Sequence, residues 1–153
     1  MSFDRQPDAR EETLLRRAAA ELSNGMVVNL GIGLPTFLPR FVPPDVEVML
    51  HSENGFVGMG PELPGGTPDH AVIDAGGRAR TVVPGAAFFD SVMSFAIVRG
   101  GRLDLAVLGA FETSLDGDLA NWKIPGKHTP GMGGGMELAQ KARQVLVVSH
   151  HLD

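Results

Sequence analysis

The sequence predicts an α/β fold with an open, mostly parallel sheet flanked by helices. Short apolar stretches that suit strands alternate along the chain with stretches whose apolar residues recur at helical spacing. The stretch 103–108 is mostly apolar, as expected for a strand that is covered on both faces. Glycine is abundant, with 20 residues, and is clustered rather than spread out, which favours backbone turns that approach a ligand closely.

The first element is a well-marked helix. Asp8 and Glu11 have the spacing of a capping box, and apolar residues recur at helical spacing between Leu14 and Leu22. Asn24 and Gly25 are expected to close this helix.

The other elements follow from apolar runs and from the glycines and prolines at their ends. Strands are expected at 26–30, 46–50, 71–74, 81–83, 103–108 and 145–148, with an extended segment at 118–124. Helices are expected near Pro35, at 87–98, where Pro84-Gly85 would open the helix, and at 136–143; a surface loop is expected at 61–69. The glycines at 55, 58 and 60 predict irregular backbone after the second strand.

Composition narrows the function classes. The 153 residues suit a single domain, and the absence of cysteine excludes disulfides, a thiol nucleophile and a zinc–thiolate site. The net charge of −5 and the lack of a basic face disfavour nucleic acid as a partner, and no apolar run is long enough to span a membrane. The polar start of the chain predicts no signal peptide, so a cytoplasmic location is expected. No two of the five histidines have metal-ligand spacing, so no metal site is expected.

Glu53 is the leading candidate for chemistry. It follows the strand predicted at 46–50 and precedes a glycine-rich turn, where functional groups are often held by a rigid scaffold. A carboxylate among glycine amides has little side-chain bulk around it and can attack an electrophile. We therefore predict that Glu53 is a nucleophile. A solvated turn glutamate is the alternative.

Two further groups of residues could carry chemistry. Gly31 and Gly33 follow a strand and precede a helix, which is the arrangement of an anion-binding turn, and Asn29 is an amide inside an apolar strand. Asn29 would either brace the Glu53 loop or meet a ligand. The glycine run 131–135 would let several backbone amides converge as an oxyanion hole, with a hinge before a helix as the alternative.

Five long stretches are similar, in order and spacing, to the second (B, or beta) subunit of the family I 3-oxoacid CoA-transferases. They are VNLGIGLPT at 28–36, HSENGFVGMGP at 51–61, VPGAAFFDSVMSFAIVRGG at 83–101, GDLANWKIPGK at 117–127 and PGMGGGMEL at 130–138. The chain resembles this subunit over nearly its whole length. The resemblance implies the CoA-transferase (NagB/RpiA-like) fold.

The resemblance also implies roles for individual residues. The glutamate of the S-E-N-G motif is the family's nucleophile and corresponds to Glu53. It would attack an acyl-CoA thioester to give a mixed anhydride, which the released CoA thiolate would convert into a glutamyl-CoA thioester. An oxyanion-stabilising amide maps to Gly134 and an active-site asparagine to Asn29, while Asn54 and Gly133 are expected to contact substrate or CoA. CoA would then be substrate and covalent carrier, with no permanently bound cofactor.

The expected partner is the family's alpha subunit, in a heterodimer and in a dimer of such heterodimers. The sequence does not identify the two acids between which CoA would move. Succinyl-CoA as the donor, with acetoacetate or 3-oxoadipate as the acceptor, is compatible with it. An acyl-CoA hydrolase and a non-catalytic small-molecule-binding domain stay open as alternative functions. Residues 1–153 are expected to form one domain that lacks the family's usual C-terminal part. A lysine that contacts the cofactor region in many relatives is replaced by Gly77, with Arg78 and Arg80 nearby.

Overall fold

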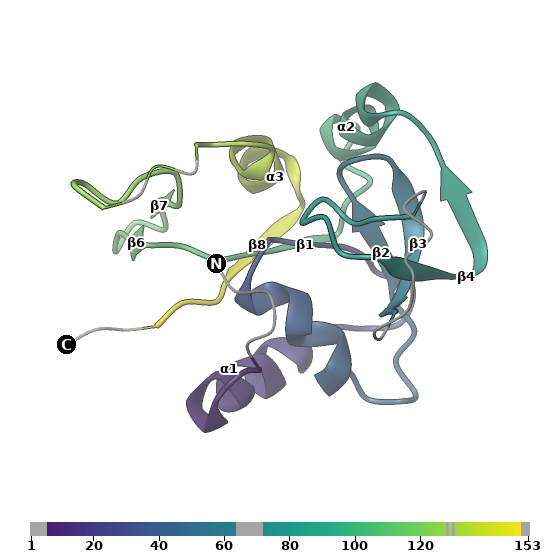
Figure 1. Ribbon diagram of the computed structural model, residues 1–153, viewed down its shortest axis with the longest axis horizontal. Coiled ribbons are helices and arrows are strands. Elements are labelled where there is room, and N and C mark those ends of the chain that lie inside the picture. The colour runs from purple at the N-terminus through teal and green to yellow at the C-terminus, as the bar shows by residue number, and fades with distance from the viewer. Residues whose placement is uncertain (1–5, 64–71, 128, 130, 151–153) are drawn as a thin grey trace.

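The computed structural model describes residues 6–63, 72–127, 129 and 131–150 (Figure 1). These residues form a six-stranded sheet in the order β4-β3-β2-β1-β5-β8. Its strands are β1 (Val27–Leu30), β2 (Met49–Ser52), β3 (Phe56–Glu62), β4 (Arg80–Phe88), β5 (Leu105–Leu108) and β8 (Gln144–Val147). Strands β2, β1, β5 and β8 are parallel, whereas β3 and β4 are antiparallel to their neighbours. The predicted α/β fold with a mostly parallel sheet is confirmed.

Helices cover both faces of this sheet (Figure 1). Helix α1 (Ala9–Ala19) and the 3-10 helix η1 (Leu34–Phe41) pack on one face, and α2 (Ser91–Arg99) and α3 (Gly135–Lys141) pack on the other. A small ribbon of β6 (Glu112–Thr113) and β7 (Leu119–Ala120) stands apart from the main sheet. The segment predicted as extended at 118–124 contains β7.

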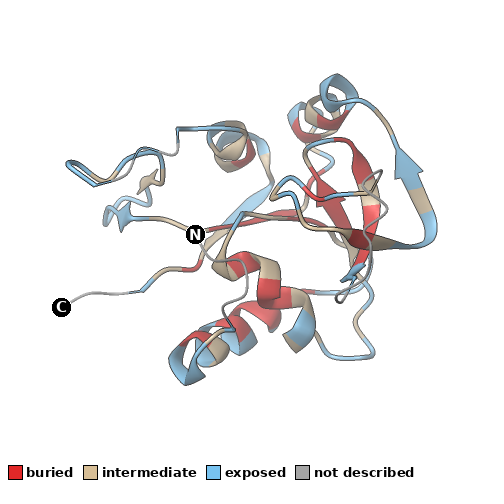
Figure 2. Cartoon of the chain, in the orientation of Figure 1, coloured by how far each residue is buried: buried red, intermediate tan, exposed pale blue. Residues whose placement is uncertain are grey.

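Strand β5 joins two halves of the hydrophobic core. Leu105 and Val107 belong to the cluster under α1 and η1, while Ala106 and Leu108 belong to the cluster under α2 and α3. All four residues are buried, and Figure 2 shows the buried residues concentrated on the central strands and the inner side of α1. The prediction of a strand covered on both faces is confirmed. Removing the apolar surface of such side chains from water is the main stabilising contribution to the fold.

Helix α1 begins where the capping box predicts. The Asp8 carboxylate accepts from the amides of Arg10 and Glu11 at 2.9 Å, and the Glu11 carboxylate accepts from the amide of Asp8 at 2.9 Å. The helix ends at Ala19, earlier than the predicted Asn24-Gly25. The chain there continues in tighter turns, in which the amide of Leu22 donates to the carbonyl of Ala19 at 3.1 Å.

The segment 80–91 differs from the prediction of a strand at 81–83 followed by a helix at 87–98. The strand expected at 81–83 continues as β4 through Pro84 and Gly85 to Phe88, so the expectation that Pro84-Gly85 opens a helix is wrong. Pro84 is tolerated because β4 is an edge strand, where the position of a missing N–H can face solvent instead of a neighbouring strand. Helix α2 begins at Ser91 because the carboxylate of Asp90 caps it, accepting from the amide of Met93 at 2.7 Å.

The segment after Glu53 also differs from its prediction. The expected irregular glycine backbone is instead the strand β3, which forms a hairpin with β2 and pairs with β4. Its glycines make room for the neighbouring strand, because a Cβ on Gly58 would lie 2.7 Å from Cα of Ala86. Close approach of two backbones is one reason for glycine inside a strand.

Smaller differences concern element ends. Strand β2 starts and ends later than the predicted 46–50, so it includes His51 and Ser52. Strand β8 matches 145–148 closely but is only partly buried, since it lies at an edge of the sheet and Val145 is exposed. Ile73 and Ala79 form an isolated antiparallel bridge around the predicted Gly76-Gly77 turn. Most of the loop predicted at 61–69, and position 71, lie outside the described residues.

Candidate functional site

Glu53 lies in the tight turn that joins β2 to β3, at the carboxyl end of a parallel strand. Gly55 closes this turn: its amide donates to the carbonyl of Ser52 at 3.0 Å, and its carbonyl accepts from the amide of Phe89 at 2.8 Å. Gly55 has φ 134°, and a Cβ there would collide with the carbonyl oxygen of Phe89. The prediction that a strand delivers Glu53 at its end is confirmed.

The carboxylate of Glu53 packs against Gly134. A Cβ built on Gly134 would lie 2.7 Å from Cδ of Glu53 and 2.8 Å from Cζ of Phe95, so a larger residue there would displace one of these side chains. Gly134 immediately precedes α3, and the ion pair between Arg99 of α2 and Glu137 of α3 holds the two helices together. The structure therefore brings together the two residues to which the sequence assigned the central roles.

Burial raises the pKa of the Glu53 carboxyl above its ordinary value. The side chain is half-buried, and within the described part of the chain no hydrogen bond reaches its carboxylate oxygens. A carboxylate that has shed part of its water and has no donor to replace it is more nucleophilic than one in solution.

His51 anchors the strand just before Glu53. Its Nδ1 lies 3.1 Å from Nδ2 of Asn29, and its Nε2 lies 2.9 Å from Oγ of Ser94 on α2. The amide group of Asn29 also donates to the carbonyl of His51 at 3.2 Å. His51 lies in β2 and is buried, although the strand predicted from the apolar run ends at residue 50. The bracing role predicted for Asn29 as one alternative is confirmed, while its contact with a ligand stays a prediction.

The donors in this network define one protonation state of His51. An amide N–H of Asn29 can only donate, so Nδ1 accepts, and Nε2 carries the proton that it donates to Ser94. The Ser94 hydroxyl in turn points at the carbonyl of Ser52, 3.5 Å away. Burial lowers the pKa of His51 to about 4, so the imidazole is neutral near pH 7.

The residues on either side of Glu53 are held from a second direction. The hydroxyl of Ser52 accepts from the amide of Ala75 at 3.0 Å, and the side-chain amide of Asn54 donates to the carbonyl of Ile73 at 2.7 Å. Asn54 therefore fixes the turn within this chain. Its predicted contact with substrate or CoA stays a prediction.

The two arginines near the Gly76-Gly77 turn both make contacts within the fold. Nε of Arg80 donates to the carboxylate of Asp74 at 2.7 Å, and both side chains are buried. The guanidinium of Arg78 lies over the ring of Phe37, 5.5 Å from its centroid, and 3.4 Å from the carboxylate of Glu62. Arg80 is thus engaged within the fold rather than directed at a ligand.

The predicted turn at Gly31 and Gly33 is only partly open. The amide of Gly31 donates to the carbonyl of Val107 at 2.7 Å, and a Cβ there would lie 3.1 Å from the same oxygen. This amide therefore serves the sheet and is not offered to an anion. Gly33 has φ 97° with open space beside it and precedes η1. Ile32, between them, lies beside Gly76.

The rest of the glycine run lies next to the segment before it. Gly133 has φ 49° and open space at its Cβ position, whereas a Cβ on Gly135 would lie 3.1 Å from Nδ2 of Asn121. The amide of Gly131 donates to the carbonyl of Trp122 at 3.2 Å. The indole of Trp122 is about half exposed.

Sequence reasoning missed Ser94 and Asp74 as supports of the site. A signal existed for each. Ser94 is the polar residue within an apolar helical stretch, and Asp74 faces Arg80 across a Gly-Gly turn. Both signals are local patterns that gain meaning only when the partner is known.

Two structural findings concern other kinds of site. Among the described residues, no three His, Asp or Glu side chains gather where they could hold a metal ion. None of the helices in these residues combines the length and the apolar character that crossing a bilayer requires.

Proteins similar in sequence carry coenzyme A transferase names. The chain is 50% identical over 145 residues to the beta subunit of a probable coenzyme A transferase of Bacillus subtilis. It is 50% identical over 140 residues to the B-type subunit of a probable succinyl-CoA:3-ketoacid coenzyme A transferase of the same organism, and 47% identical over 144 residues to the beta subunit of an acetate CoA-transferase of Escherichia coli. These matches cover 95%, 92% and 94% of this chain and 67%, 65% and 65% of the relatives. The chain thus spans about two thirds of their length.

Solved structures with the same fold include enzymes of two kinds. Glutaconate coenzyme A-transferase of Acidaminococcus fermentans matches with a TM-score of 0.67 and 20% identity, over 97% of this chain and 58% of that chain. The decarboxylase AibA/AibB matches with a TM-score of 0.59 and 21% identity, over 90% and 57%. Because the fold supports both reactions, it does not by itself determine the chemistry.

The family follows from a match that spans most of the chain. The family model for coenzyme A transferases matches residues 12–152, which include Glu53, Gly134 and both of their supporting segments. This chain belongs to the coenzyme A transferase family.

Proposed function

We propose that this chain acts as the beta subunit of a CoA-transferase that moves CoA from an acyl-CoA to a 3-oxoacid such as acetoacetate or 3-oxoadipate. The observation that carries the proposal is the packing of the half-buried Glu53 carboxylate against Gly134. A nucleophile and a backbone segment able to stabilise an oxyanion are then adjacent. The names of the relatives support the reaction class, which the fold alone would leave open.

The proposed reaction proceeds through a covalent carrier at Glu53. Its carboxylate oxygen attacks the thioester carbonyl of the donor, the C–S bond breaks, and CoA leaves as a thiolate, so that an acyl-glutamyl anhydride remains. The thiolate attacks the glutamyl carbonyl and expels the donor acid, giving a glutamyl-CoA thioester. The acceptor carboxylate then repeats these steps in reverse and leaves as the new acyl-CoA.

Each tetrahedral intermediate in this sequence carries a negative oxygen. We assign its stabilisation to the backbone amide of Gly134, because the adjacent carboxylate places the reacting carbon within reach of this segment. Remote binding energy from the nucleotide and pantetheine parts of CoA would hold the thioester against Glu53. Asn29, Gly33, Asn54 and Gly133 are the remaining proposed contacts to substrate or CoA.

The proposal includes an alpha-subunit partner. The relatives are named as beta or B subunits, which supports a heterodimer and, beyond it, a dimer of heterodimers. CoA acts as a substrate and transient covalent group, not as a resident cofactor. A cytoplasmic location, expected from the sequence, belongs to the same proposal.

Acyl-CoA hydrolysis is the second candidate. The Glu53 side chain is only partly enclosed by this chain, so water can reach a glutamyl thioester unless the partner covers it. Release of CoA without any acceptor acid would identify this activity.

The test is direct detection of the carrier. The alpha–beta complex, with the full-length subunit, is incubated with succinyl-CoA or acetyl-CoA, and its intact mass is measured. We expect a CoA adduct that disappears on addition of acetoacetate. Borohydride should convert the adduct into an alcohol at Glu53, which peptide mapping locates.

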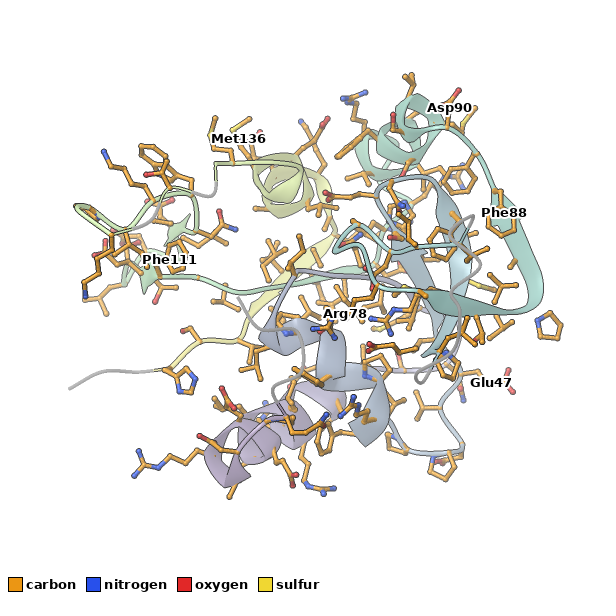
Figure 3. The ribbon with its side chains drawn as sticks, viewed as in Figure 1. Glu47, Arg78, Phe88, Asp90, Phe111 and Met136 are labelled. Atoms are coloured by element: carbon orange, nitrogen blue, oxygen red, sulfur yellow. The ribbon has the colours of Figure 1, made fainter. Side chains whose placement is uncertain are left out.

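Glu53→Gln should form no adduct and lose transfer activity by at least about a thousandfold, because the amide is not nucleophilic. Glu47→Gln is the matched control. Glu47 is exposed and lies before β2, at the opposite end of that strand (Figure 3), so its variant should react normally. Transfer that survives Glu53→Gln would refute the proposal and favour a different use of the fold.

A further inference from the structure

One of the attachments of the turn that carries Glu53 is the short segment of residues 73–75. Ser52 accepts a hydrogen bond from the amide of Ala75, and Asn54 donates one to the carbonyl of Ile73. These two contacts lie immediately before and immediately after the proposed nucleophile. The position of Glu53 therefore depends on where this segment lies.

Asp74, in the middle of that segment, organises its backbone. One carboxylate oxygen accepts from the amides of Gly76 and Arg78 at 2.9 and 3.0 Å, and the Asp74 amide donates to the carbonyl of Arg78 at 2.9 Å. The other carboxylate oxygen accepts from Nε of Arg80 at 2.7 Å. The carboxylate thus links the two arms of the Gly76-Gly77 turn to each other.

Burial makes this arrangement hard to replace. Asp74 and Arg80 are each only 6% exposed. A buried charge that loses its partner is strongly unfavourable, so the backbone would rearrange instead of leaving the remaining charge unpaired. Any such rearrangement moves Ile73 and Ala75, which hold the two flanks of Glu53.

We propose that Asp74 and Arg80 are positioning residues for Glu53, acting through residues 73–75. The proposal rests on the proposed function, in which Glu53 is the nucleophile. The packing of the Glu53 carboxylate against Gly134 leaves little tolerance, and a misplacement of about 1 Å can cost about a hundredfold in rate. Arg80 serves this purpose and does not bind a phosphate of CoA.

The test compares Asp74→Asn with Glu62→Gln in the alpha–beta complex. Both changes replace an acid by its amide near the start of β4, where Glu62 pairs in register with Arg80, but the side chain of Glu62 is 42% exposed and its partner is Arg78. Adduct formation is measured in single turnovers with acetyl-CoA and with acetyl-pantetheine, which lacks the nucleotide and its phosphates. We expect Asp74→Asn to slow adduct formation by about ten- to a hundredfold with both substrates, and Glu62→Gln to leave it unchanged. The concentration giving half-maximal rate should change by no more than about twofold.

A role in phosphate binding would give a different result. Arg80→Gln would then raise the concentration of acetyl-CoA that gives half of the maximal rate of adduct formation. Adduct formation with acetyl-pantetheine would be unaffected. That outcome, or a normal rate for Asp74→Asn, would overturn the proposal. If Asp74→Asn fails to fold, adduct formation by Ser52→Ala is measured instead. This variant removes the hydroxyl that accepts a hydrogen bond from the amide of Ala75, and it leaves no buried charge unpaired. A normal rate for Ser52→Ala would then refute it.

Failure of the proposed function gives a separate result. In that case the unmodified complex itself forms no adduct with acetyl-CoA. An unmodified complex that forms the adduct, together with variants that match its rate, would disprove only the positioning role.

Discussion

The turn that carries Glu53 and the glycine segment that faces it are held in very different ways. The turn is fixed by His51 on one side and by residues 73–75 on the other. In the described part of the glycine segment, the amide of Gly131 donates a hydrogen bond to the carbonyl of Trp122, and the other backbone hydrogen bonds are those that start α3. A carboxylate must be held at one place to attack, and amides that stabilise an oxyanion also act best when they are preorganised. With fewer hydrogen bonds of its own, the glycine segment depends more on its packing against Glu53 and Phe95.

Among the variants that test this comparison, the largest effect is expected from a side chain added between the two regions. Gly134→Ala places a Cβ 2.7 Å from Cδ of Glu53, so one region must move. We expect adduct formation to fall by about a hundredfold or more. Gly109→Ala is a matched control, because open space surrounds that Cβ position and its backbone is ordinary. Equal rates for the two variants, measured by intact mass in single turnovers, would show that Glu53 and Gly134 do not cooperate.

The second expected effect is on the pH dependence of adduct formation. Only ionised Glu53 can attack, and burial raises its pKa. As the solution is acidified, the rate should therefore begin to fall at a higher pH than it would for an ordinary glutamate. The same shift makes the folded state less stable as pH rises through the raised pKa, because the carboxylate must then be charged where water is scarce. Glu53→Gln should therefore raise stability near neutral pH, and the gain should vanish in acid. Urea denaturation at several pH values measures this gain, and a gain that persists in acid would contradict burial of the charge as its cause.

The third expected effect concerns the support behind Glu53. Burial lowers the pKa of His51 from 6.5 to about 4, so the unfolded chain takes up a proton that the folded one refuses. Stability should be complete above the unfolded pKa and should decline as pH falls from about 6.5 towards about 4, by up to about 3 kcal/mol. In His51→Gln this decline should be absent from the denaturation profile. An unchanged profile would mean that another group titrates.

The smallest expected effect is at the neighbouring glycine. Gly133 needs a left-handed backbone but has open space, so Gly133→Ala should cost only about 1–2 kcal/mol of local strain. Gly133→Asn should cost less, since asparagine adopts this conformation more readily. The two variants are compared by thermal unfolding and by adduct rate. A loss as large as that of Gly134→Ala would show that the segment is as rigid as the turn.

The sequence predicted features that depend on short spacings. The capping box at Asp8 and Glu11 and the apolar pattern of β5 each determine a structure within one or two turns of chain, and both were confirmed. The position of Glu53 at a strand end was equally local. Such patterns are reliable because the residues that interact are close in sequence.

Features that depend on distant partners were not predicted. Gly58 and Gly60 signal a turn when taken alone, but they make room for β4, whose residues come much later in the chain. The strand predicted at 46–50 stops short of His51, whereas β2 continues two residues beyond the apolar run. His51 has its partners, Asn29 and Ser94, on two other elements, so its role appears only once the strands and α2 are assembled.

The alternation of β5 between the two core clusters has a consequence for insertions and deletions. Because successive side chains of a strand face opposite sides, a shift of one residue would exchange the contents of both half-cores at once. Leu105 and Val107 would then face α2 and α3, and the small Ala106 would leave a void beneath α1. Single-residue deletions between 103 and 108 should therefore be among the least tolerated changes in the chain, whereas the ribbon of β6 and β7, which lies outside the sheet, should accept changes in length readily.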